Sequence, residues 1–332
     1  MTLTRKEFLK TFALGGAAAM TGLSAPAILH AQTPTLLRLN LVVNNQDPTF
    51  AMWQDFGNRI EEASEGTLKV EVYPNEQLGK TVDMIEAVSR GAPILQDGDP
   101  THYYNYVPEF ASMMAPFLLQ KPDDIVTLWN SDLVAGWEKT LQSKGLRVLT
   151  MTYFGTQQLL SARQVHVRDD TAGMKIRNAP TKMWNEVGRV LGGNITNTAF
   201  SEVYSALSQG VADGAFAPLP MLYASRWYET QPYISLTGHL MSITSITMSQ
   251  ALYEKLPEPA QRALDEVGRG YTAIRQPQME AVELEYRKKL EDAGIVFNEV
   301  DRASFMAAAA DTPKQFPEWR PDLYEQINKI LG

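Results

Sequence analysis

Residue types that carry out chemistry are sparse in this chain. It has no cysteine, so a disulfide framework, a thiolate metal site and a cysteine nucleophile are excluded. It has four histidines. The histidines show no metal-ligand spacing, and neither a G-x-S-x-G motif nor a P-loop sequence is present. We therefore expect no cofactor and no metal centre. The four histidines are His30, His102, His166 and His239.

Two aspartates could act at a site. Asp97 and Asp99 follow an apolar, strand-like stretch and are separated by one glycine. They could accept hydrogen bonds from hydroxyl groups, hold a cation or an ammonium group, or act as a catalytic base. The alternative is ordinary loop capping and turn formation. The sequence leaves these possibilities open.

Arg177 is the basic residue best suited to a site. It ends the short strand-like stretch Met174–Arg177, in which the apolar side chains point the other way. A planar guanidinium can clamp a carboxylate through two hydrogen bonds. The alternative is a surface ion pair with Asp169 or Asp170.

The elements that must position these residues alternate between strand and helix. Leu36–Val43 and Leu68–Val72 have the alternation of strands, and helical spacing follows each at 48–63 and 82–88. The pattern recurs between Arg147 and Gly214. This order predicts an α/β architecture with a largely parallel sheet.

A long helical pattern covers about 258–293, with Pro277 inside it. A helix of about 36 residues would reach about 54 Å, which exceeds the width of one small domain. Proline should kink it. The stretch either bridges two domains or consists of two helices.

The first 31 residues have the features of an export signal. Arg5, Lys6 and Lys10 precede a short apolar stretch, and small residues lie near Ala31. That stretch is shorter than the roughly 18 residues of a membrane-spanning helix. Thr4–Lys10 also resembles the twin-arginine export motif, with lysine in place of the second arginine. We expect residues 1–31 to be a signal peptide, of the general or the twin-arginine type, and the mature protein to be periplasmic.

Composition limits the remaining classes. The length of 332 residues predicts two domains, and the hydrophobic content of 44% predicts a globular protein. Its net charge of −8 and its lack of a basic block argue against nucleic acid as a partner. After residue 31 no segment is apolar and long enough to span a membrane.

Three ordered stretches resemble one family, the DctP-type solute-binding proteins of TRAP transporters. The resemblance covers nearly all of residues 36–330. Its motifs are VEVYPNEQLG with its continuation to APFL, AGMKIRNAP, and AFSEVYSALSQGVADG. They lie at 70–79 (continuing to 118), 172–180 and 199–214.

The resemblance implies a two-lobed periplasmic-binding-protein fold, with the long kinked helix bridging the lobes. Lobe I would comprise 32–153 plus about 243–276, and lobe II would comprise 154–242 plus about 277–332. The lobes would close on an organic acid. The loaded protein would then deliver the acid to the small and large membrane subunits of the transporter, without catalysis.

The resemblance also implies the ligand contacts. The family's arginine at the position of Arg177 grips the ligand carboxylate, and the ring at Phe200 packs on the ligand. Because ligands bind beyond the carboxyl ends of strands in α/β sheets, residues at other strand ends are candidates too. The full predicted set is Arg177, Phe200, Gln157, Asp99, Asn45, Trp184, Tyr153, Phe216 and Asp97.

Two departures from the family narrow the ligand. The family commonly has a second arginine where this chain has Gln157, and an asparagine where it has Ala217. A glutamine cannot balance a second carboxylate. We therefore expect a monocarboxylate of hydroxy, keto, sugar or aromatic character. A cluster of tyrosines at 103, 104 and 106 either adds aromatic surface to the site or packs on itself.

Two rival functions remain at this point. One is a secreted α/β enzyme acting on a sugar acid, with Asp97, Asp99 or a histidine as base. The other is the binding protein of an ATP-driven importer. An enzyme would consume its ligand, whereas a binding protein would return it unchanged.

Overall fold

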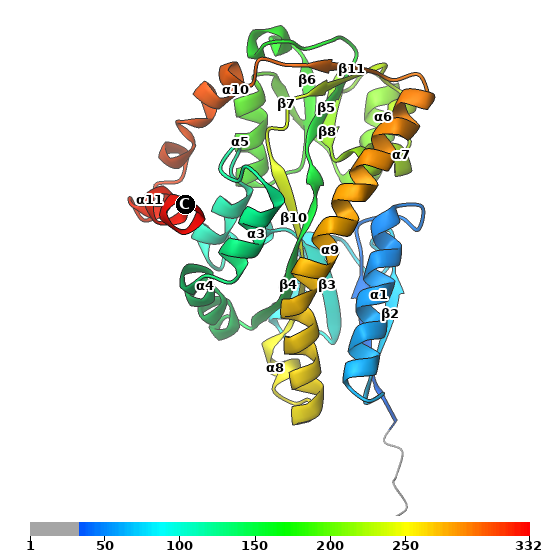
Figure 1. Ribbon diagram of the computed structural model, residues 1–332, viewed down its shortest axis with the longest axis vertical. Helices are drawn as coiled ribbons and strands as arrows, with labels where there is room; N and C mark the ends of the chain where they lie inside the picture. The colour runs from blue at the N-terminus through cyan, green and yellow to red at the C-terminus, as the bar shows by residue number, and fades with distance from the viewer. Residues whose placement is uncertain (1–32) are drawn as a thin grey trace, which may run out of the picture. The chain divides into compact units, whose positions relative to one another are not determined.

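The computed structural model describes residues 33–332, so the predicted signal peptide lies outside the described residues. Residues 34–332 form one compact unit (Figure 1). Strands and helices alternate from its start, and the strands assemble into two sheets.

The first sheet has the strand order β2-β1-β3-β10-β4. β1 pairs in parallel with β2 and β3, whereas β10 runs antiparallel to both β3 and β4. The register of β10 against β4 shifts between Ser242 and Ile243. The strands are β1 (Thr35–Asn40), β2 (Leu68–Tyr73), β3 (Ile94–Gly98), β4 (Leu146–Thr156) and β10 (Met241–Ser249).

The second sheet has the order β11-β9-β5-β8-β6-β7. β5 runs antiparallel to its neighbours β8 and β9, and the other pairs are parallel. The strands are β5 (Gln158–Ser161), β6 (Lys175–Asn178), β7 (Asn194–Asn197), β8 (Gly214–Ala217), β9 (Tyr233–Leu236) and β11 (Val296–Glu299).

Helices pack against the strands of both sheets. Capping residues that the sequence supplies start several of them: the Asp47 side chain accepts from the Thr49 N–H, and Thr181 caps the helix that carries Trp184. The α-helices are α1 (Pro48–Ala63), α2 (Thr81–Ser89), α3 (Pro122–Trp129), α4 (Asp132–Ser143), α5 (Lys182–Leu191), α6 (Val203–Ser208), α7 (Leu219–Ala224), α8 (Gln250–Tyr253), α9 (Glu258–Asp292), α10 (Arg302–Ala309) and α11 (Leu323–Leu331). The 3-10 turns are η1 (Pro100–Tyr103), η2 (Pro108–Met114), η3 (Arg168–Thr171), η4 (Phe200–Glu202), η5 (Trp227–Glu229) and η6 (Thr312–Gln315).

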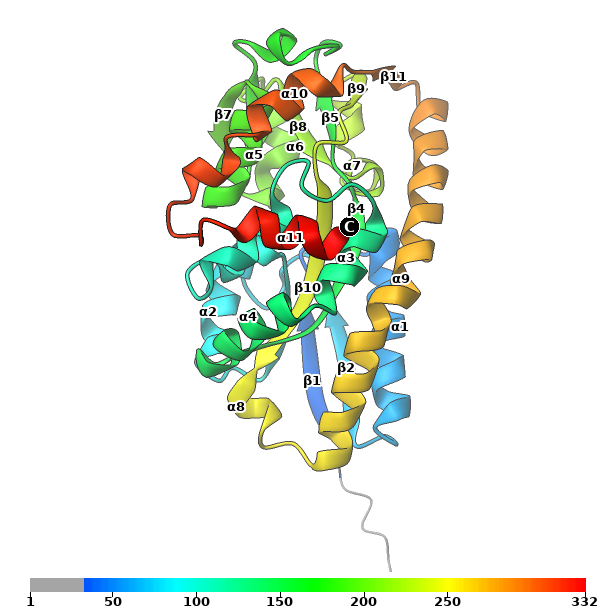
Figure 2. The same cartoon turned by 60° about the vertical axis from the view of Figure 1, so that its left-hand side comes forward.

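The long helix α9 contributes to the cores of both sheets. Its Tyr271 packs in one cluster with Leu37 and Trp53 of the first sheet and α1. Its Tyr286 packs in another cluster with Ile234 of the second sheet. Figures 1 and 2 show α9 running alongside both groups of strands. A single helix therefore bridges the two sheets.

Close packing explains an unusual residue in this helix. A side-chain carbon at Gly268 would collide with the carbonyl oxygen of Leu149 on β4. α9 can approach the strand this closely only because position 268 has no side chain. The helix continues through Pro277 without a break, and the predicted kink there stays a prediction.

The C-terminal segment returns across the molecule after β11. α10 packs against α5, and α11 packs against α3, as Figure 2 shows. α3 adjoins β4 of the first sheet, whereas α5 adjoins strands of the second. The chain therefore connects the two sheets through α10 and α11 as well as through α9.

The predicted two-lobed α/β fold with a long bridging helix is confirmed. The predicted largely parallel arrangement holds with one exception in each sheet, because β10 enters the first sheet antiparallel and β5 enters the second antiparallel. Both strands lie next to a passage of the chain between the sheets, β4 to β5 and β9 to β10. The residue limits given for the lobes stay a prediction.

Candidate ligand-binding site

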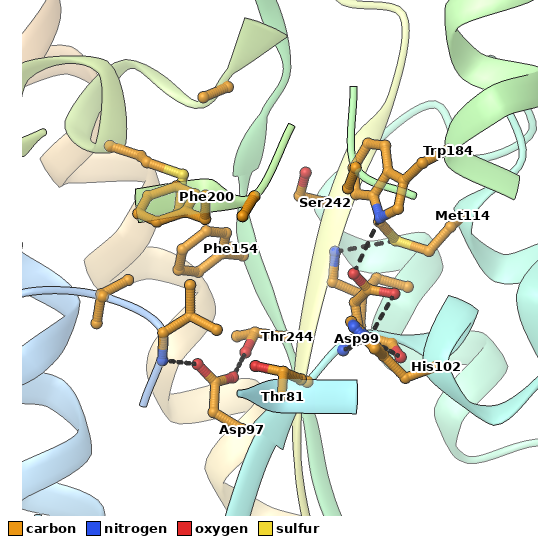
Figure 3. Close-up of a pocket in the computed structure, with 18 of the residues that line it drawn as sticks. Thr81, Asp97, Asp99, His102, Met114, Phe154, Trp184, Phe200, Ser242 and Thr244 are labelled. Atoms are coloured by element: carbon orange, nitrogen blue, oxygen red, sulfur yellow. Dashed lines mark hydrogen bonds and ion pairs between the residues drawn. The ribbon is translucent and has the colours of Figure 1, made fainter. Parts of the chain in front are cut away.

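A cavity of about 380 Å³ lies between residues of the two sheets. This volume is in the range of small-molecule sites. The first sheet contributes Asp97 from β3 and Thr244 from β10, and the second contributes Arg177 from β6 and Phe216 from β8. Figure 3 shows side chains that line it. The cavity thus lies near the ends of strands, where open α/β sheets bind ligands.

Arg177 enters the cavity wall as a buried cation. Its Nε and Nη2 atoms donate to the carbonyl oxygen of Thr198 at 3.1 and 2.8 Å, and its side chain is only 8% exposed. Burial lowers the pKa of Arg177 to about 10, so it remains charged at neutral pH. In the described part of the chain, no acidic side chain forms an ion pair with it.

The alternative surface pairing of Arg177 does not occur. The carboxylate of Asp170 instead accepts the backbone N–H groups of His166 and Val167, at 2.8 and 3.0 Å. Asp169 is exposed at the surface. The Arg177 guanidinium is left with donors that a carboxylate could use.

Aromatic rings form the wall beside Arg177. Phe200 packs against Trp227 with ring centroids 5.3 Å apart, and Phe216 packs against Trp184 at 5.8 Å. All four line the cavity. Phe200 is only half-buried, so it is a wall residue rather than a fully enclosed core residue. An apolar wall around few polar groups is typical of small-molecule sites.

Trp184 also joins the two sides of the cavity. The N-cap Thr181 fixes the start of α5, and the Trp184 indole Nε1 donates to Asp99 Oδ2 at 3.2 Å. Asp99 in turn caps η1 and accepts from the Thr101 N–H at 2.7 Å. Burial alone would raise the pKa of Asp99, but His102 and Thr101 hold it below its usual range.

Asp97 is buried in the opposite wall. Its carboxylate accepts a hydrogen bond from the Thr244 hydroxyl and one from the Val42 N–H at 3.3 Å. Burial raises the pKa of Asp97 to about 6, although these bonds and the charge of Arg275 oppose the shift. Asp97 therefore titrates close to neutral pH.

Gln157, the residue for which the resemblance implied an arginine in the family, lines the cavity. Its amide Nε2 donates to Ser242 Oγ at 2.6 Å, and its backbone N–H donates to the carbonyl oxygen of Leu240 at 2.9 Å. Its side-chain oxygen Oε1 is buried without a hydrogen-bond partner. The side chain is thus fixed in orientation and has one unused acceptor.

Two of the predicted contacts lie outside the cavity lining. Asn45 is exposed in the loop that follows β1. Tyr153 is buried, and its hydroxyl bonds Glu283 of α9 and Thr156. Successive strand residues face opposite sides, so Phe154, the residue after Tyr153, lines the cavity instead. These two placements correct the expectation from the sequence.

The tyrosine cluster also lies elsewhere. Tyr103 is fully buried, and its hydroxyl bonds Ser245 and Thr247 on β10. Tyr104 and Tyr106 pack on the core beside it. None of the three lines the cavity.

Several lining residues were not predicted from the sequence. Strand alternation could have indicated Phe154, but the others come together only through folding. They include Met114, Phe154, Met221, Trp227, Ser242 and Thr244, together with the charged groups Glu76, Lys80 and His102.

No metal cluster is evident: within residues 33–332 no three histidine or acidic side chains gather as a metal site. Across the same range no helix is both long and apolar enough to cross a bilayer.

The fold and the sequence match a known family. Residues 39–318 match the model of bacterial extracellular solute-binding protein family 7, DctP. A solute-binding protein of Roseobacter denitrificans is 31% identical over 89% of this chain and 91% of its own length. The sialic acid-binding periplasmic protein SiaP of Vibrio cholerae is 27% identical over 76% of this chain and 80% of its own.

A solved structure agrees with these matches. A TRAP periplasmic solute-binding protein from Ochrobacterium anthropi, crystallised with bound L-fuconate, has a TM-score of 0.86 and 26% identity. The match covers 90% of this chain and all of that one. The chain therefore belongs to the DctP family of TRAP transporter solute-binding proteins.

Proposed function

We propose that this protein binds an organic monocarboxylate, with Arg177 holding the carboxylate and Phe200 packing on the ligand. The observation that carries the proposal is a buried guanidinium that faces the cavity and has no acidic partner in residues 33–332. A buried charge without a partner is costly. An anionic ligand would compensate for that cost.

The composition of the cavity supports one carboxylate rather than two. Gln157 is neutral, and the other side of the cavity carries Asp97 and Asp99, which would repel a second carboxylate. L-fuconate and sialic acid, which relatives bind, each carry one carboxylate. A monocarboxylate with hydroxy, keto, sugar or aromatic character therefore fits this chain.

We further propose that the loaded protein delivers its ligand to the small and large membrane subunits of a TRAP transporter. Membership of the DctP family supports this role. The predicted signal at residues 1–31 would export the chain to the periplasm, where such a subunit works. Binding without catalysis is then sufficient for function.

Closure of the two sides on the ligand would signal the loaded state. Several hydrogen bonds already cross the cavity: Trp184 to Asp99, Thr181 to Thr101, and Asn44 to the carbonyl of Ala224. The bending points are the passages between the sheets near 153 and 243 and the middle of α9. A smaller radius of gyration with ligand, measured by solution scattering, would support closure, and an unchanged radius at saturation would contradict it.

A thermal-shift screen against organic acids tests the proposed function. A ligand at about 100 times its Kd should stabilise the fold by about 2.7 kcal/mol. Chromatography of the incubated ligand then separates the two classes of function. A binding protein returns the acid unchanged, whereas an enzyme that uses Asp97 or His102 as a base would consume it.

A further inference from the structure

The cavity wall contains two ion pairs in which both partners are lining residues. The ammonium of Lys80 lies 3.1 Å from the carboxylate of Glu76. The Nδ1 atom of His102 lies 3.3 Å from the carboxylate of Asp99. These four residues line the cavity, and each already has an oppositely charged or titratable neighbour.

Two other charged residues of the cavity form no ion pair within residues 33–332. Arg177 and Asp97 form no ion pair within the 4.0 Å limit in the described residues. Arg177 belongs to the second sheet and Asp97 to the first, and they are 8% and 5% exposed. The cavity thus has one buried, unpaired cation and one buried, unpaired anion on opposite sides.

The surroundings of Asp97 leave acceptor capacity free. Thr244 from β10 and the Val42 N–H after β1 each donate one hydrogen bond to it. Arg275 of α9 and His102 of η1 act on it electrostatically only. An ionised carboxylate has about four acceptor positions, so about two remain for other donors.

A second acceptor lies on the same strand. Ser242 anchors Gln157, whose Oε1 has no donor, and Thr244 anchors Asp97. Ser242 and Thr244 are two positions apart on β10, which is about 7 Å along a strand. Asp97 and Gln157 both line the cavity, and a ligand that satisfies their free acceptor positions must donate hydrogen bonds.

We propose that the bound carboxylate also carries a protonated amine, which Asp97 binds while Arg177 binds the carboxylate. This inference rests on the proposed function and specifies its ligand. An ammonium group donates three hydrogen bonds, accepts none and balances the charge of Asp97. A hydroxyl donates one bond and carries no charge, and a keto oxygen only accepts.

The electrostatics of Asp97 agree with this assignment. Burial raises its pKa to about 6, although the charge of Arg275 opposes the shift, so its ionised form is penalised. A bound ammonium group favours the ionised form. The apolar rings of Phe154, Phe200 and Trp227 leave room in the same cavity for an aromatic or aliphatic portion of the ligand.

Matched trios of acids test the inference on the wild-type protein at pH 7.5. Each trio presents one skeleton as amino, hydroxy and keto acid. The first is phenylalanine, phenyllactate and phenylpyruvate, and the second is 4-aminopentanoate, 4-hydroxypentanoate and 4-oxopentanoate. The thermal-shift screen extends the trios to other skeletons, and calorimetry measures Kd for those that bind.

The inference predicts that the amino member binds at least about tenfold tighter than its hydroxy and keto counterparts in a trio that binds. It is overturned if acids bind but their amino forms bind equally or more weakly in every such trio. If no acid of any form binds, the proposed function itself fails. The two failures are therefore distinguishable.

The variant Asp97→Asn assigns the amine to its residue. It should lower the affinity for the amino acid by at least about 30-fold and the affinity for the hydroxy acid by less than about threefold. Asp169→Asn, at an exposed carboxylate outside the cavity, is the matched control and should change neither. An equal loss for both ligands would overturn the role of Asp97. If Asp97→Asn does not fold, the wild-type trios still decide.

Discussion

The two sides of the cavity carry opposite charges, and the surroundings of those charges differ. The side of the second sheet places one guanidinium, Arg177, among the rings of Phe200, Phe216 and Trp227. The side of the first sheet surrounds its carboxylates with donors from the chain, as in Asp99 with Trp184 and Thr101. One side is a cation in an apolar wall, and the other is a hydrogen-bonded acidic surface.

Burial acts on both sides with opposite effects on pKa. It lowers the pKa of Arg177 to about 10 and raises the pKa of Asp97 to about 6, because it disfavours whichever form is charged. Arg177 keeps its charge throughout the physiological range, whereas Asp97 can lose its charge in mild acid. The cationic side is therefore a permanent anchor, and the acidic side is adjustable.

The largest expected effect comes from removing the cationic anchor. Arg177→Ala should weaken binding of a carboxylate ligand by about 3–5 kcal/mol, because the buried carboxylate loses its counter-charge. The fold should persist, since within residues 33–332 the Arg177 side chain donates hydrogen bonds only to the carbonyl of Thr198. Calorimetry measures the affinity, and circular dichroism measures the fold.

Lys175→Ala is the matched control for this change. Lys175 is an exposed cation on the same strand, two residues before Arg177, and it does not line the cavity. Its loss should leave the affinity within a few-fold of wild type. Near-native affinity in a folded Arg177→Ala protein would disprove the carboxylate clamp and the contrast between the two sides.

The next effect concerns stability on the acidic side. The pKa of Asp97 is about 6 in the folded protein and 3.8 when unperturbed, so between these values the folded state holds a proton that the unfolded state has lost. Asp97 therefore reduces stability as pH rises from about 4 to 6, by at most about 3 kcal/mol. Denaturant unfolding of ligand-free protein should show Asp97→Asn gaining stability relative to wild type over this pH window.

A constant difference between Asp97→Asn and wild type from pH 4 to 7 would contradict this pKa. It would mean that Asp97 is as easily ionised in the cavity as in water. The acidic side would then be a second permanent charge, rather than an adjustable one.

The sequence predicted the two sides of the cavity unequally. Arg177 and Phe200 lie in local motifs, and their place in the cavity could be expected from those motifs alone. Ser242 and Thr244 could not, because β10 enters the first sheet from far along the chain and runs antiparallel. Contacts such as Thr244 to Asp97 join residues 147 positions apart, and no local pattern encodes them.

The two misplaced residues show a different limit. Strand alternation determines that Tyr153 and Phe154 face opposite sides, but the sequence does not say which side is the cavity. Tyr153 faces Glu283 of α9, a partner that folding alone brings into position. Asn45 lies in a turn whose path the strand pattern does not define.

A third, smaller effect tests whether the site holds one carboxylate. At pH 7.5 a hydroxy or keto monoacid should bind tighter than the dicarboxylate of equal chain length. Two other cations that could approach a second carboxylate already have partners: Arg163 donates to the carbonyls of Asp170 and Ala172, and Lys182 donates to Glu318. Competition calorimetry decides. A diacid that binds more than about tenfold tighter, about 1.4 kcal/mol, would disprove the monocarboxylate assignment.

The smallest expected effect tests the hydrogen bond that joins the two sides. Trp184→Phe keeps an aromatic ring beside Phe216 but removes the indole N–H that donates to Asp99. A hydrogen bond to a charged group contributes about 1.5–3 kcal/mol when fully buried. Trp184 and Asp99 line the cavity, and water can replace the lost donor when the two sides part. We therefore expect ligand affinity to fall by about 1 kcal/mol, roughly fivefold, with little change in the stability of the ligand-free protein. Calorimetry and thermal unfolding of the same sample separate the two quantities.

Thr140→Val, which removes an exposed hydroxyl on α4 remote from the cavity, is the control. If Trp184→Phe lowers the stability of the free protein and leaves affinity unchanged, the bond to Asp99 supports the fold rather than the closing of one side on the other.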